Sequence, residues 1–231
     1  MRILFLGDSI TEGVPGVSYV DIIKEEYQNW DIVNRGKGGD TARSLYKRIL
    51  KMNDLEQFDK IFLFVGVNDV FGRISIPYKI IKVITRQKSA KTIQLFERHY
   101  ETLIQKLLEV NNDIVVIPPL LIGEDYNNRW NKEVKSLVDI VGKYVRQYSI
   151  CYLDLYNEFR SYITKKSPSD YLPMKVSELL KDVKSLTSTE MIDSKSKQRK
   201  LHLTLDGVHI NSKGASMISK MIIEYINRNN T

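Results

Sequence analysis

The stretch that decides the fold opens the chain and reads Arg2-Ile3-Leu4-Phe5-Leu6-Gly7-Asp8-Ser9-Ile10-Thr11-Glu12-Gly13. A short apolar run that ends at a glycine is typical of a strand buried on both faces of a parallel sheet. The turn after such a strand opens at the carboxyl edge of the sheet, where α/β proteins bind ligands. The pattern therefore predicts a strand over residues 3–6 that delivers Ser9 to a ligand-binding edge. An ordinary turn with Ser9 as a helix N-cap would have the same letters, so this stretch alone leaves that role open.

Three later segments add polar groups to the same predicted edge. The first is Asn34-Arg35-Gly36-Lys37-Gly38-Gly39-Asp40-Thr41, whose glycines permit positive φ and let a backbone N–H approach a ligand closely. The second, Ile61-Phe62-Leu63-Phe64-Val65-Gly66-Val67-Asn68-Asp69, has a buried-strand pattern that ends in an amide donor. The third is Asp206-Gly207-Val208-His209. Its spacing of three predicts a helical turn with both side chains on one side, so the carboxylate can orient the imidazole.

The order of elements predicts the fold class. Strand-like runs at residues 3–6, 31–33, 61–65, 114–117 and 151–155 alternate with segments of helical periodicity. Such alternation predicts an α/β fold with a mostly parallel five-stranded sheet and helices on both faces. The clearest helical patterns are Ile93, Phe96, Tyr100, Leu103 and Leu107, and Ala215, Ile218, Ile222 and Ile226 within residues 212–227. Length alone leaves one or two domains open at 231 residues, and the order of elements favours a single domain over residues 1–231.

Two segments exceed what a minimal sheet-and-helix domain needs, at about residues 70–91 and 156–205. The second carries Val176, Leu179, Leu180, Val183 and Leu186 at helical spacing, which predicts an ordered helical insertion. Two roles for it stay open, a lid over the site or a surface elaboration that never contacts substrate. Residues 185–200 are polar with few apolar anchors, so we expect that part to be mobile.

The charge of the chain is basic, with 35 Lys and Arg against 28 Asp and Glu and a formal net charge of +7. A basic surface attracts polyanions, and the cations concentrate at residues 79–91 and 195–200. However, neither cluster belongs to a nucleic-acid-binding motif, and aromatic residues do not alternate with Arg as in a stacking platform. We therefore expect solvated helix and loop faces and no nucleic-acid partner.

Cysteine and histidine usage gives no sign of a metal site. Cys151 is the single cysteine, which excludes an intrachain disulfide, and we expect it to be a buried apolar residue of its strand. The three histidines lack companion cysteines and a His-x-x-x-His spacing, so we expect neither a metal nor a cofactor. His99 and His202 are expected to be packing or surface residues.

The amino terminus leads directly into the first predicted strand, without a charged n-region, a separate apolar h-region and a cleavage site. The sequence also lacks a run of eighteen or more apolar residues. We therefore expect a soluble, cytoplasmic protein without a membrane span. The oligomeric state has no signal in the sequence.

Together, the four polar segments resemble the GDSL-type or SGNH hydrolases, a family named for Ser, Gly, Asn and His in separate blocks. The blocks occur here in the family's order, as Gly7-Asp8-Ser9, Gly39, Gly66-Val67-Asn68-Asp69 and Asp206-Gly207-Val208-His209. One departure is that members often continue past the histidine with Pro, whereas Ile210-Asn211 follows here. The resemblance covers nearly the whole chain and implies a three-layer, flavodoxin-like fold.

The resemblance also implies a set of roles that agree with the chemistry of ester hydrolysis. Ser9 is the expected nucleophile, His209 the general base and Asp206 the group that orients the imidazole. The expected oxyanion hole consists of the backbone N–H groups of Ser9 and Gly39 and the side-chain amide of Asn68. The reaction would be ester cleavage through an acyl-enzyme intermediate.

Other residues near these blocks are candidates for structural roles or for substrate contacts. We expect Asp8 and Asp69 to accept hydrogen bonds from turn backbone, and keep Asp8 with Val70 and Phe71 as candidate substrate contacts. The expected partner is a small-molecule ester, and acyl esters, thioesters and acetylated sugars all stay open. Apolar residues after Asn68 favour an acyl pocket, whereas tyrosines would suit sugar stacking; among these are Tyr156, Tyr162 and Tyr171.

Three rival interpretations are weaker. An α/β-hydrolase would have Gly-x-Ser-x-Gly in mid-chain, and here Thr11 replaces the second glycine. A dinucleotide-binding protein would have Gly-x-Gly-x-x-Gly after its first strand, which residues 7–12 do not match. The third rival is a catalytically silent binding or scaffold protein with the same fold. The presence of all four blocks argues against it, because a silent protein has no chemical need for them together.

Overall fold

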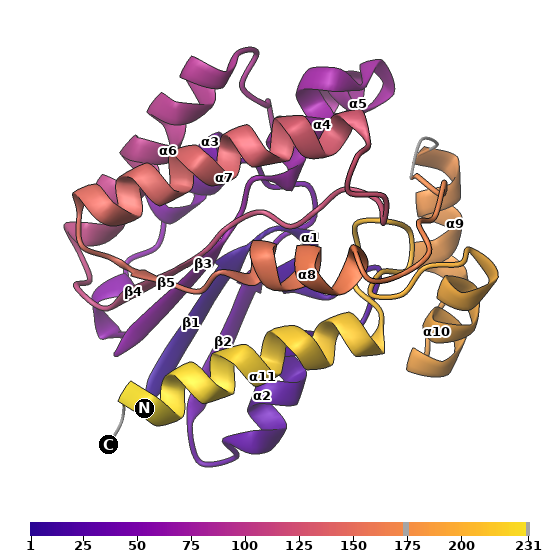
Figure 1. The fold of residues 1–231 in the computed structure, drawn as a ribbon. Helices are drawn as coiled ribbons and strands as arrows, with labels where there is room; N and C mark the ends of the chain where they lie inside the picture. Colours follow the sequence, from indigo (N-terminus) through magenta and orange to yellow (C-terminus); the bar gives the residue numbers. More distant parts are fainter. Residues whose placement is uncertain (173–175, 230–231) are drawn as a thin grey trace.

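The computed structural model describes residues 1–172 and 176–229. Its centre is a five-stranded parallel sheet of order β2-β1-β3-β4-β5 (Figure 1). The strands are β1 Arg2–Gly7, β2 Asp31–Gly36, β3 Lys60–Phe64, β4 Ile114–Ile117 and β5 Cys151–Tyr152. From β1, the sheet extends to β2 on one side and to β3, β4 and β5 on the other. The carboxyl ends of β1 and β3 are therefore the switch point where doubly wound sheets bind ligands. The predicted α/β class and its flavodoxin-like order are confirmed.

Helices cover both faces of the sheet. Figure 1 shows α3, α6 and α7 on one face and α2 and α11 on the other. These helices are α2 Tyr19–Glu26, α3 Ala42–Ile49, α6 Ile93–Leu108, α7 Arg129–Gln147 and α11 Ser212–Asn229. The apolar positions predicted for α6 and α11 are buried, among them Phe96, Leu103, Ile218 and Ile222, except for Ile93, which is half-buried. The two helical patterns are therefore confirmed, and both helices pack an apolar stripe on the sheet.

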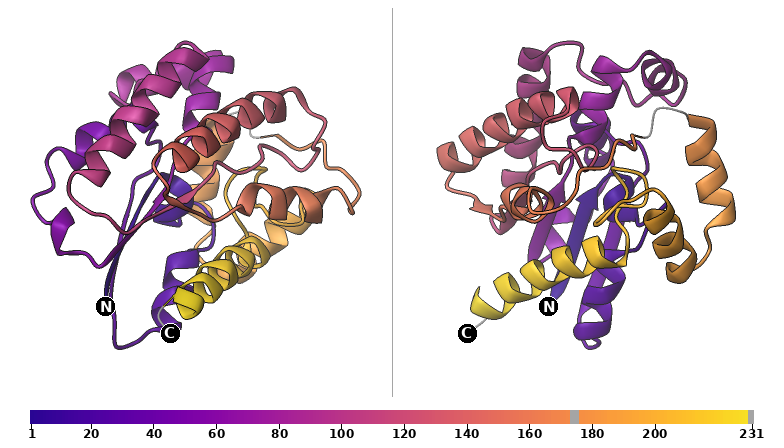
Figure 2. Two further views of the ribbon diagram at one scale, coloured as in Figure 1. Left: turned by 60° about the vertical axis from the view of Figure 1, so that its left-hand side comes forward. Right: turned by 45° about the vertical axis from the view of Figure 1, so that its right-hand side comes forward.

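Shorter helices surround the carboxyl end of the sheet. They are α1 Ser9–Glu12, α4 Val67–Ile74, α5 Ile76–Ile84, α8 Leu155–Ile163, α9 Val176–Ser185 and α10 Thr189–Gln198. A 3₁₀ turn, η1 at Leu55–Gln57, precedes β3 at the opposite, amino end of the sheet. Figure 2 shows α9 and α10 side by side at the border of the molecule, away from the two chain ends. Among the helices in the described ranges, none has the length and hydropathy of a bilayer span.

The segment after residue 185 differs from the prediction. It forms α10 and is not left without structure. Polar contacts fix it: Ser196 is buried and its Oγ donates to the Thr204 carbonyl at 2.7 Å, and Asp193 accepts from the backbone N–H of Ser212 at 3.0 Å. A count of apolar residues underestimates how firmly such a segment is held, because hydrogen bonds anchor it.

The predicted burial of Cys151 is also wrong, because its thiol is exposed. The reason is its place in the sheet. Strand β5 has two residues and, within the described part of the chain, pairs with β4 alone, so it forms an edge of the sheet. The strand ends at Tyr152 instead of at residue 155 as predicted, and α8 begins at Leu155.

Candidate active site

Three polar side chains from opposite ends of the chain meet at the carboxyl edge of β1. Ser9 Oγ lies 2.9 Å from Nε2 of His209, and Nδ1 of the same ring lies 2.7 Å from Oδ2 of Asp206. Ser9 and His209 are each 7% exposed and Asp206 is 1% exposed. Because an ionised carboxylate only accepts hydrogen bonds, Nδ1 carries the proton and Nε2 of a neutral ring is left to accept from the serine hydroxyl.

Ser9 is the first residue of α1 and does not cap it. Asp8 occupies the N-cap position, and its Oδ1 accepts from the backbone N–H of Ile10 at 3.0 Å. The alternative in which Ser9 serves as N-cap is therefore wrong. The serine side chain is free of that role and is directed to the imidazole.

The segment that carries Asp206 and His209 is a loop, which corrects the predicted helical turn. Oδ1 of Asp206 accepts from the backbone N–H groups of Val208 at 3.0 Å and His209 at 2.8 Å. The loop is closed by an antiparallel bridge between Thr204 and Ile210. An aspartate that folds back onto the N–H two and three residues later forms an Asx-type turn, and this brings carboxylate and imidazole together at the same spacing.

A buried glutamate that the sequence analysis missed holds the start of this loop. Glu124 is 2% exposed, and its Oε1 accepts from the backbone N–H groups of Leu203 and Thr204, both at 2.8 Å. The Thr204 hydroxyl donates to the same oxygen at 2.7 Å, and the N–H of His202 donates to Oε2 at 2.5 Å. Glu124 stands outside the four blocks, so no short motif marks it.

The glycine loop lies beside Ser9. Gly39 has φ of +80°, which is left-handed backbone, and a Cβ on Gly38 would lie 4.0 Å from Cβ of Ser9. The N–H of Gly38 donates to Oε2 of Glu12 at 2.7 Å, and the Gly38 carbonyl accepts from Nε2 of Gln87 at 2.7 Å. The loop is thus anchored on both sides.

Asn68 lies in the first turn of α4 and is 8% exposed. Its Nδ2 donates to Oδ2 of Asp8 at 3.2 Å, and its Oδ1 accepts from Nζ of Lys82 at 2.7 Å. Asp69, the next residue, accepts from the backbone N–H groups of Ala42 at 2.9 Å and Ala90 at 3.4 Å. Asp8 and Asp69 therefore accept from turn backbone, as expected from the sequence.

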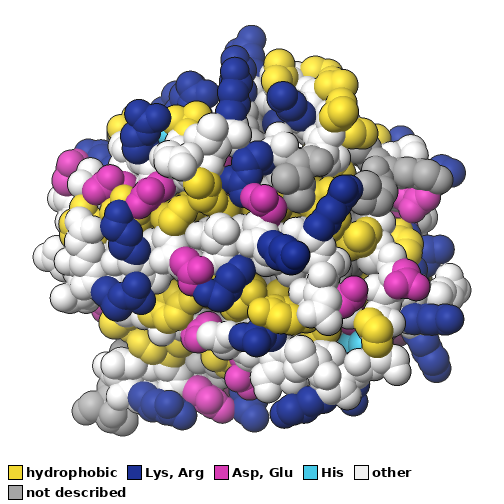
Figure 3. Space-filling view, turned by 45° about the horizontal axis from the view of Figure 1, so that its top comes forward, with side chains coloured by type: hydrophobic (Ala, Val, Ile, Leu, Met, Phe, Trp, Pro, Cys, Tyr) yellow, Lys and Arg dark blue, Asp and Glu magenta, His cyan; other side chains and the backbone are white. Residues whose placement is uncertain are grey.

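The predicted exposure of Lys82 is wrong. This residue belongs to the cationic cluster that we expected to face solvent, yet it is 4% exposed, and its Nζ also donates to the Gly39 carbonyl at 2.5 Å. Helix α5 directs Tyr78 and Lys82 inward, whereas its aliphatic residues Ile76, Ile80, Val83 and Ile84 are exposed. Exposed hydrophobic side chains among Lys and Arg are visible near the upper edge of Figure 3.

Burial shifts the titration of this cluster. Burial lowers the pKa of the Lys82 ammonium to about 8, although the carboxylates of Asp8, Asp69 and Asp40 act in the opposite direction. Burial likewise raises the pKa of Asp8 and of Asp69, each to about 6. The ammonium of Lys82 is thus a buried cation near three carboxylates, and it donates to the side chain of Asn68.

His209 and Asp206 each shift the pKa of the other. Burial disfavours the imidazolium, but the charge and hydrogen bond of Asp206 outweigh burial and raise the pKa of His209 above its ordinary value. Burial would raise the pKa of Asp206, but His209 and two backbone N–H groups hold it below its ordinary value. The carboxylate therefore remains ionised and stabilises the charged form of the ring.

A small apolar cavity of about 160 Å³ opens at Ser9, Asn68 and His209. The other lining residues are Val14, Pro15, Val67, Phe71, Tyr78, Leu179, Leu180, Val183 and Val208. Phe71 thus lines the cavity as expected, whereas Val70 is fully buried in the core and does not. Helix α9, which belongs to the second insertion, supplies part of the cavity wall through Leu179, Leu180 and Val183.

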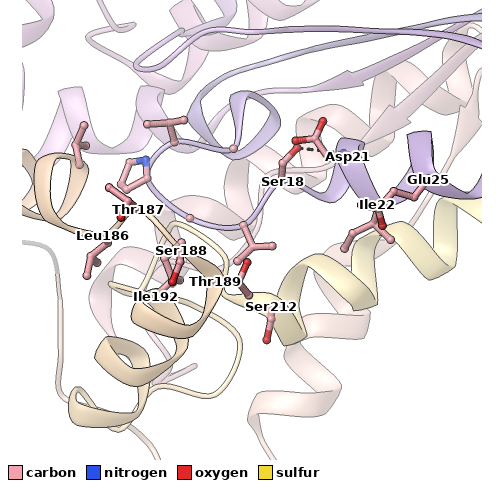
Figure 4. A pocket seen from close by; sticks show the side chains of 16 residues that line it. Ser18, Asp21, Ile22, Glu25, Leu186, Thr187, Ser188, Thr189, Ile192 and Ser212 are labelled. Carbon is pink, nitrogen blue, oxygen red and sulfur yellow. Dashed lines mark hydrogen bonds between the residues drawn. The ribbon is translucent and has the colours of Figure 1, made fainter.

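A wider groove of about 570 Å³ continues from this cavity and shares Val14, Pro15 and Val183 with it. Figure 4 shows Ser18, Asp21, Ile22 and Glu25 on one side of the groove. Thr187, Ser188, Thr189, Ile192 and Ser212 lie on the other. The tyrosines that we considered for sugar stacking, at positions 156, 162 and 171, line neither space. The site therefore combines a small apolar cavity with a larger, more polar groove.

The fold recurs among solved structures. An acetyl xylan esterase matches with a TM-score of 0.70 at 22% identity, covering 98% of this chain and 100% of that chain. An acetylxylan esterase from Geobacillus stearothermophilus matches with a TM-score of 0.68 at 16% identity, covering 96% and 92%. The lipase/acylhydrolase from Enterococcus faecalis matches with 0.64 at 20% identity, covering 99% and 97%. At these identities the likeness shows the shared fold.

A comparison with curated proteins finds no match. The profile of the GDSL-like Lipase/Acylhydrolase family matches residues 5–216, which include every one of the four polar blocks. The family resemblance noted in the sequence is therefore confirmed, and with it the class of enzyme. The chain belongs to the GDSL-like lipase/acylhydrolase family of carboxylic ester hydrolases.

Proposed function

We propose that this chain hydrolyses esters of short carboxylic acids, with Ser9 as nucleophile, His209 as general base and Asp206 as its partner. The observation that carries the proposal is the hydrogen-bonded series from Ser9 Oγ to His209 Nε2 at 2.9 Å and from His209 Nδ1 to Asp206 Oδ2 at 2.7 Å. A nucleophile, a base within hydrogen-bond reach and an orienting carboxylate are the parts that acyl transfer requires.

The reaction proceeds in two halves. Ser9 Oγ attacks the ester carbonyl carbon while His209 Nε2 takes the hydroxyl proton, and the carbonyl oxygen becomes an oxyanion. The tetrahedral intermediate collapses when His209 returns that proton to the leaving alcohol, which leaves an acyl group on Ser9. Water then attacks the acyl-enzyme while His209 Nε2 takes one of its protons. His209 returns this proton to Ser9 Oγ as the bond between Oγ and the acyl group breaks, and the carboxylic acid leaves. Asp206 stabilises the imidazolium in both halves.

Three donors are proposed for the oxyanion: the backbone N–H groups of Ser9 and Gly39 and the Nδ2 amide of Asn68. Support comes from their location, because Asn68 lines the same cavity as Ser9. Lys82 also joins the Asn68 side chain to the Gly39 carbonyl. Nδ2 of Asn68 has two N–H groups, and its bond to Asp8 uses one of them. The second is available to a substrate oxygen.

The cavity limits the acyl group. A cavity of about 150 Å³ holds one benzene ring, so the 160 Å³ next to Ser9 fits roughly six carbon atoms. We propose that acetyl to short linear acyl groups enter this cavity and that the alcohol portion lies in the wider groove. The acetyl xylan esterases among the structural neighbours make an acetylated saccharide a specific candidate for the whole substrate.

Activity measurements test this proposal. We expect kcat/KM on nitrophenyl esters to be highest for acetate to hexanoate and to fall steeply for decanoate and palmitate. Acetylated xylo-oligosaccharides and a short acyl thioester, run in parallel, identify the alcohol or thiol that the groove accepts. Ser9→Ala should abolish turnover, whereas Ser216→Ala, at an exposed serine of α11, should not change it. No turnover of any substrate would instead favour the silent binding protein.

A further inference from the structure

A lysine and a glutamine hold the groups that we assign to the oxyanion. Nζ of Lys82 donates to Oδ1 of Asn68 at 2.7 Å and to the Gly39 carbonyl at 2.5 Å. Nε2 of Gln87 donates to the Gly38 carbonyl at 2.7 Å. Both side chains come from residues 70–91, a segment outside the four blocks, and neither lines the cavity at Ser9. Any effect of the two side chains on catalysis is therefore exerted through the donors and not on the substrate.

The bond from Lys82 selects one orientation of the Asn68 amide. An amide side chain has two nearly equal orientations that exchange its oxygen and nitrogen, and its partners decide between them. The ammonium only donates, so it requires the Asn68 oxygen, and this directs Nδ2 toward Asp8 and the cavity. Without Lys82, the Gly39 carbonyl would lose its donor and the Asn68 amide could rotate to donate there instead. That rotation would turn the N–H away from the substrate.

The bond from Gln87 fixes a peptide plane. The carbonyl of Gly38 and the N–H of Gly39 belong to the same planar unit and point in opposite directions across it. Because Gly39 has left-handed backbone and glycine is conformationally permissive, this plane needs an external anchor. Gln87 supplies one by holding the Gly38 carbonyl, and so it sets the direction of the Gly39 N–H.

We propose that Lys82 and Gln87 are positioning residues that preorganise the oxyanion donors Asn68 and Gly39. This inference rests on the proposed function, since it assigns a task only if those two residues bind an oxyanion. Donors that already point at the developing charge need no reorganisation in the transition state, which is the source of their catalytic effect. A misoriented donor loses that effect while the substrate still binds.

The cost of burying Lys82 supports a functional task for it. A buried ammonium loses its hydration and must be paired. Here the compensating charges are those of Asp8, Asp69 and Asp40, and Arg48 in turn donates to Oδ2 of Asp40 at 2.9 Å. Burial lowers the pKa of Lys82 to about 8, so the ammonium form predominates at neutral pH.

The test compares Lys82→Met and Gln87→Leu with a matched control, Lys79→Met, which removes an exposed cation from the same helix. Each protein is first titrated with a serine-reactive phosphonate, so that rates are expressed per reactive site. We expect Lys82→Met to lower kcat about 10²-fold and Gln87→Leu about 10-fold, with KM within twofold of the wild type. Lys79→Met should match the wild type.

A second measurement uses a short alkyl boronic acid, which forms a tetrahedral adduct with a serine nucleophile and mimics the transition state. Its inhibition constant should rise in Lys82→Met by about the same factor as kcat/KM falls. A merely structural role would reduce the number of titrated sites and leave this constant unchanged. If Lys82→Met does not fold, Gln87→Leu decides, because it removes an anchor without unbalancing the buried charges.

The two hypotheses fail in different ways. If the wild type gives no turnover, or if Ser9→Ala keeps it, the proposed function is wrong. If the wild type is active through Ser9 but Lys82→Met and Gln87→Leu keep the wild-type kcat and boronate affinity per titrated site, the inference alone is overturned. A rise in KM without a change in kcat would also overturn it, since that pattern identifies substrate contacts.

Discussion

Glu124 and Thr204 are 80 residues apart in the sequence, yet the carboxylate of Glu124 accepts both the backbone N–H and the hydroxyl of Thr204, at 2.8 and 2.7 Å. The same carboxylate accepts two further N–H groups of the segment that leads to Asp206. Asp206 and His209, the proposed orienting carboxylate and general base, thus sit on a loop that one buried carboxylate holds. Loss of its charge should loosen that loop.

Glu124→Gln should therefore destabilise the protein. The new NH₂ group would face an N–H donor, and a buried unsatisfied donor costs about 1–3 kcal/mol. Urea unfolding should show this loss, and activity should fall because Asp206 is less well held. Glu26→Gln, at an exposed position of α2, serves as control and should stay within about 0.5 kcal/mol of the wild type. An equally stable Glu124→Gln would show that the loop does not depend on the carboxylate.

The pH dependence should follow His209. Only the neutral imidazole can accept the serine proton, and the pKa of His209 is raised, so kcat/KM should rise with pH through a midpoint above the ordinary histidine value of about 6.5. Asp206→Asn removes the charge that raises this pKa while burial remains. The midpoint should then move to lower pH, and kcat should fall by about 10⁴. A midpoint that does not move would contradict the assigned pair.

Asn68→Ala should lower kcat by about 10²–10³ with little change in KM, because it removes one oxyanion donor. The side chain of Asn68 is also hydrogen-bonded to the buried Lys82 and Asp8. We therefore expect an added loss of stability of about 1–3 kcal/mol. Steady-state kinetics and thermal unfolding separate the two effects. Full turnover in a folded Asn68→Ala variant would remove Asn68 from the oxyanion hole.

Gly39→Ala should reduce both stability and turnover. At φ of +80° an added Cβ would lie 2.5 Å from Oε1 of Gln87 and 3.0 Å from Nζ of Lys82. Left-handed backbone costs an alanine about 1–2 kcal/mol before these contacts are counted. Gly142→Ala in the middle of α7 is the matched control, and it should instead gain about 0.5–1 kcal/mol because alanine favours helix. Wild-type kinetics in Gly39→Ala would show that this loop does not contribute to the site.

Much of the fold could be predicted because buried parallel strands and glycine turns leave local signals. The run from Ile3 to Gly7 is apolar at every buried position, and the helices α6 and α11 repeat their apolar residues at the helical period. The first three blocks converge because the carboxyl ends of parallel strands share one edge of the sheet. The fourth lies on a loop that reaches the same edge, where His209 contacts Ser9. Even the wrong expectation of a helical turn at Asp206 placed its carboxylate beside the imidazole.

The residues that support the site could not be predicted, since their signals are not local. A lysine usually indicates a solvated face, and periodicity does not reveal which face of α5 packs inward. Lys82 is buried because carboxylates from three other segments of the chain compensate its charge. The structural role of Glu124 is visible only in the folded chain, where the backbone N–H groups of residues 202–204 lie beside its carboxylate. Such contacts between remote segments exist only in the folded chain.

Covalent labelling tests the central claim most directly. The wild-type protein is treated with a serine-reactive phosphonate, and intact-mass measurement counts the adducts before peptide mapping locates them. We predict one adduct per chain, on the peptide that contains Ser9, and none in Ser9→Ala. Labelling of Ser9→Ala at the wild-type stoichiometry would contradict the account, because another residue would then be the nucleophile.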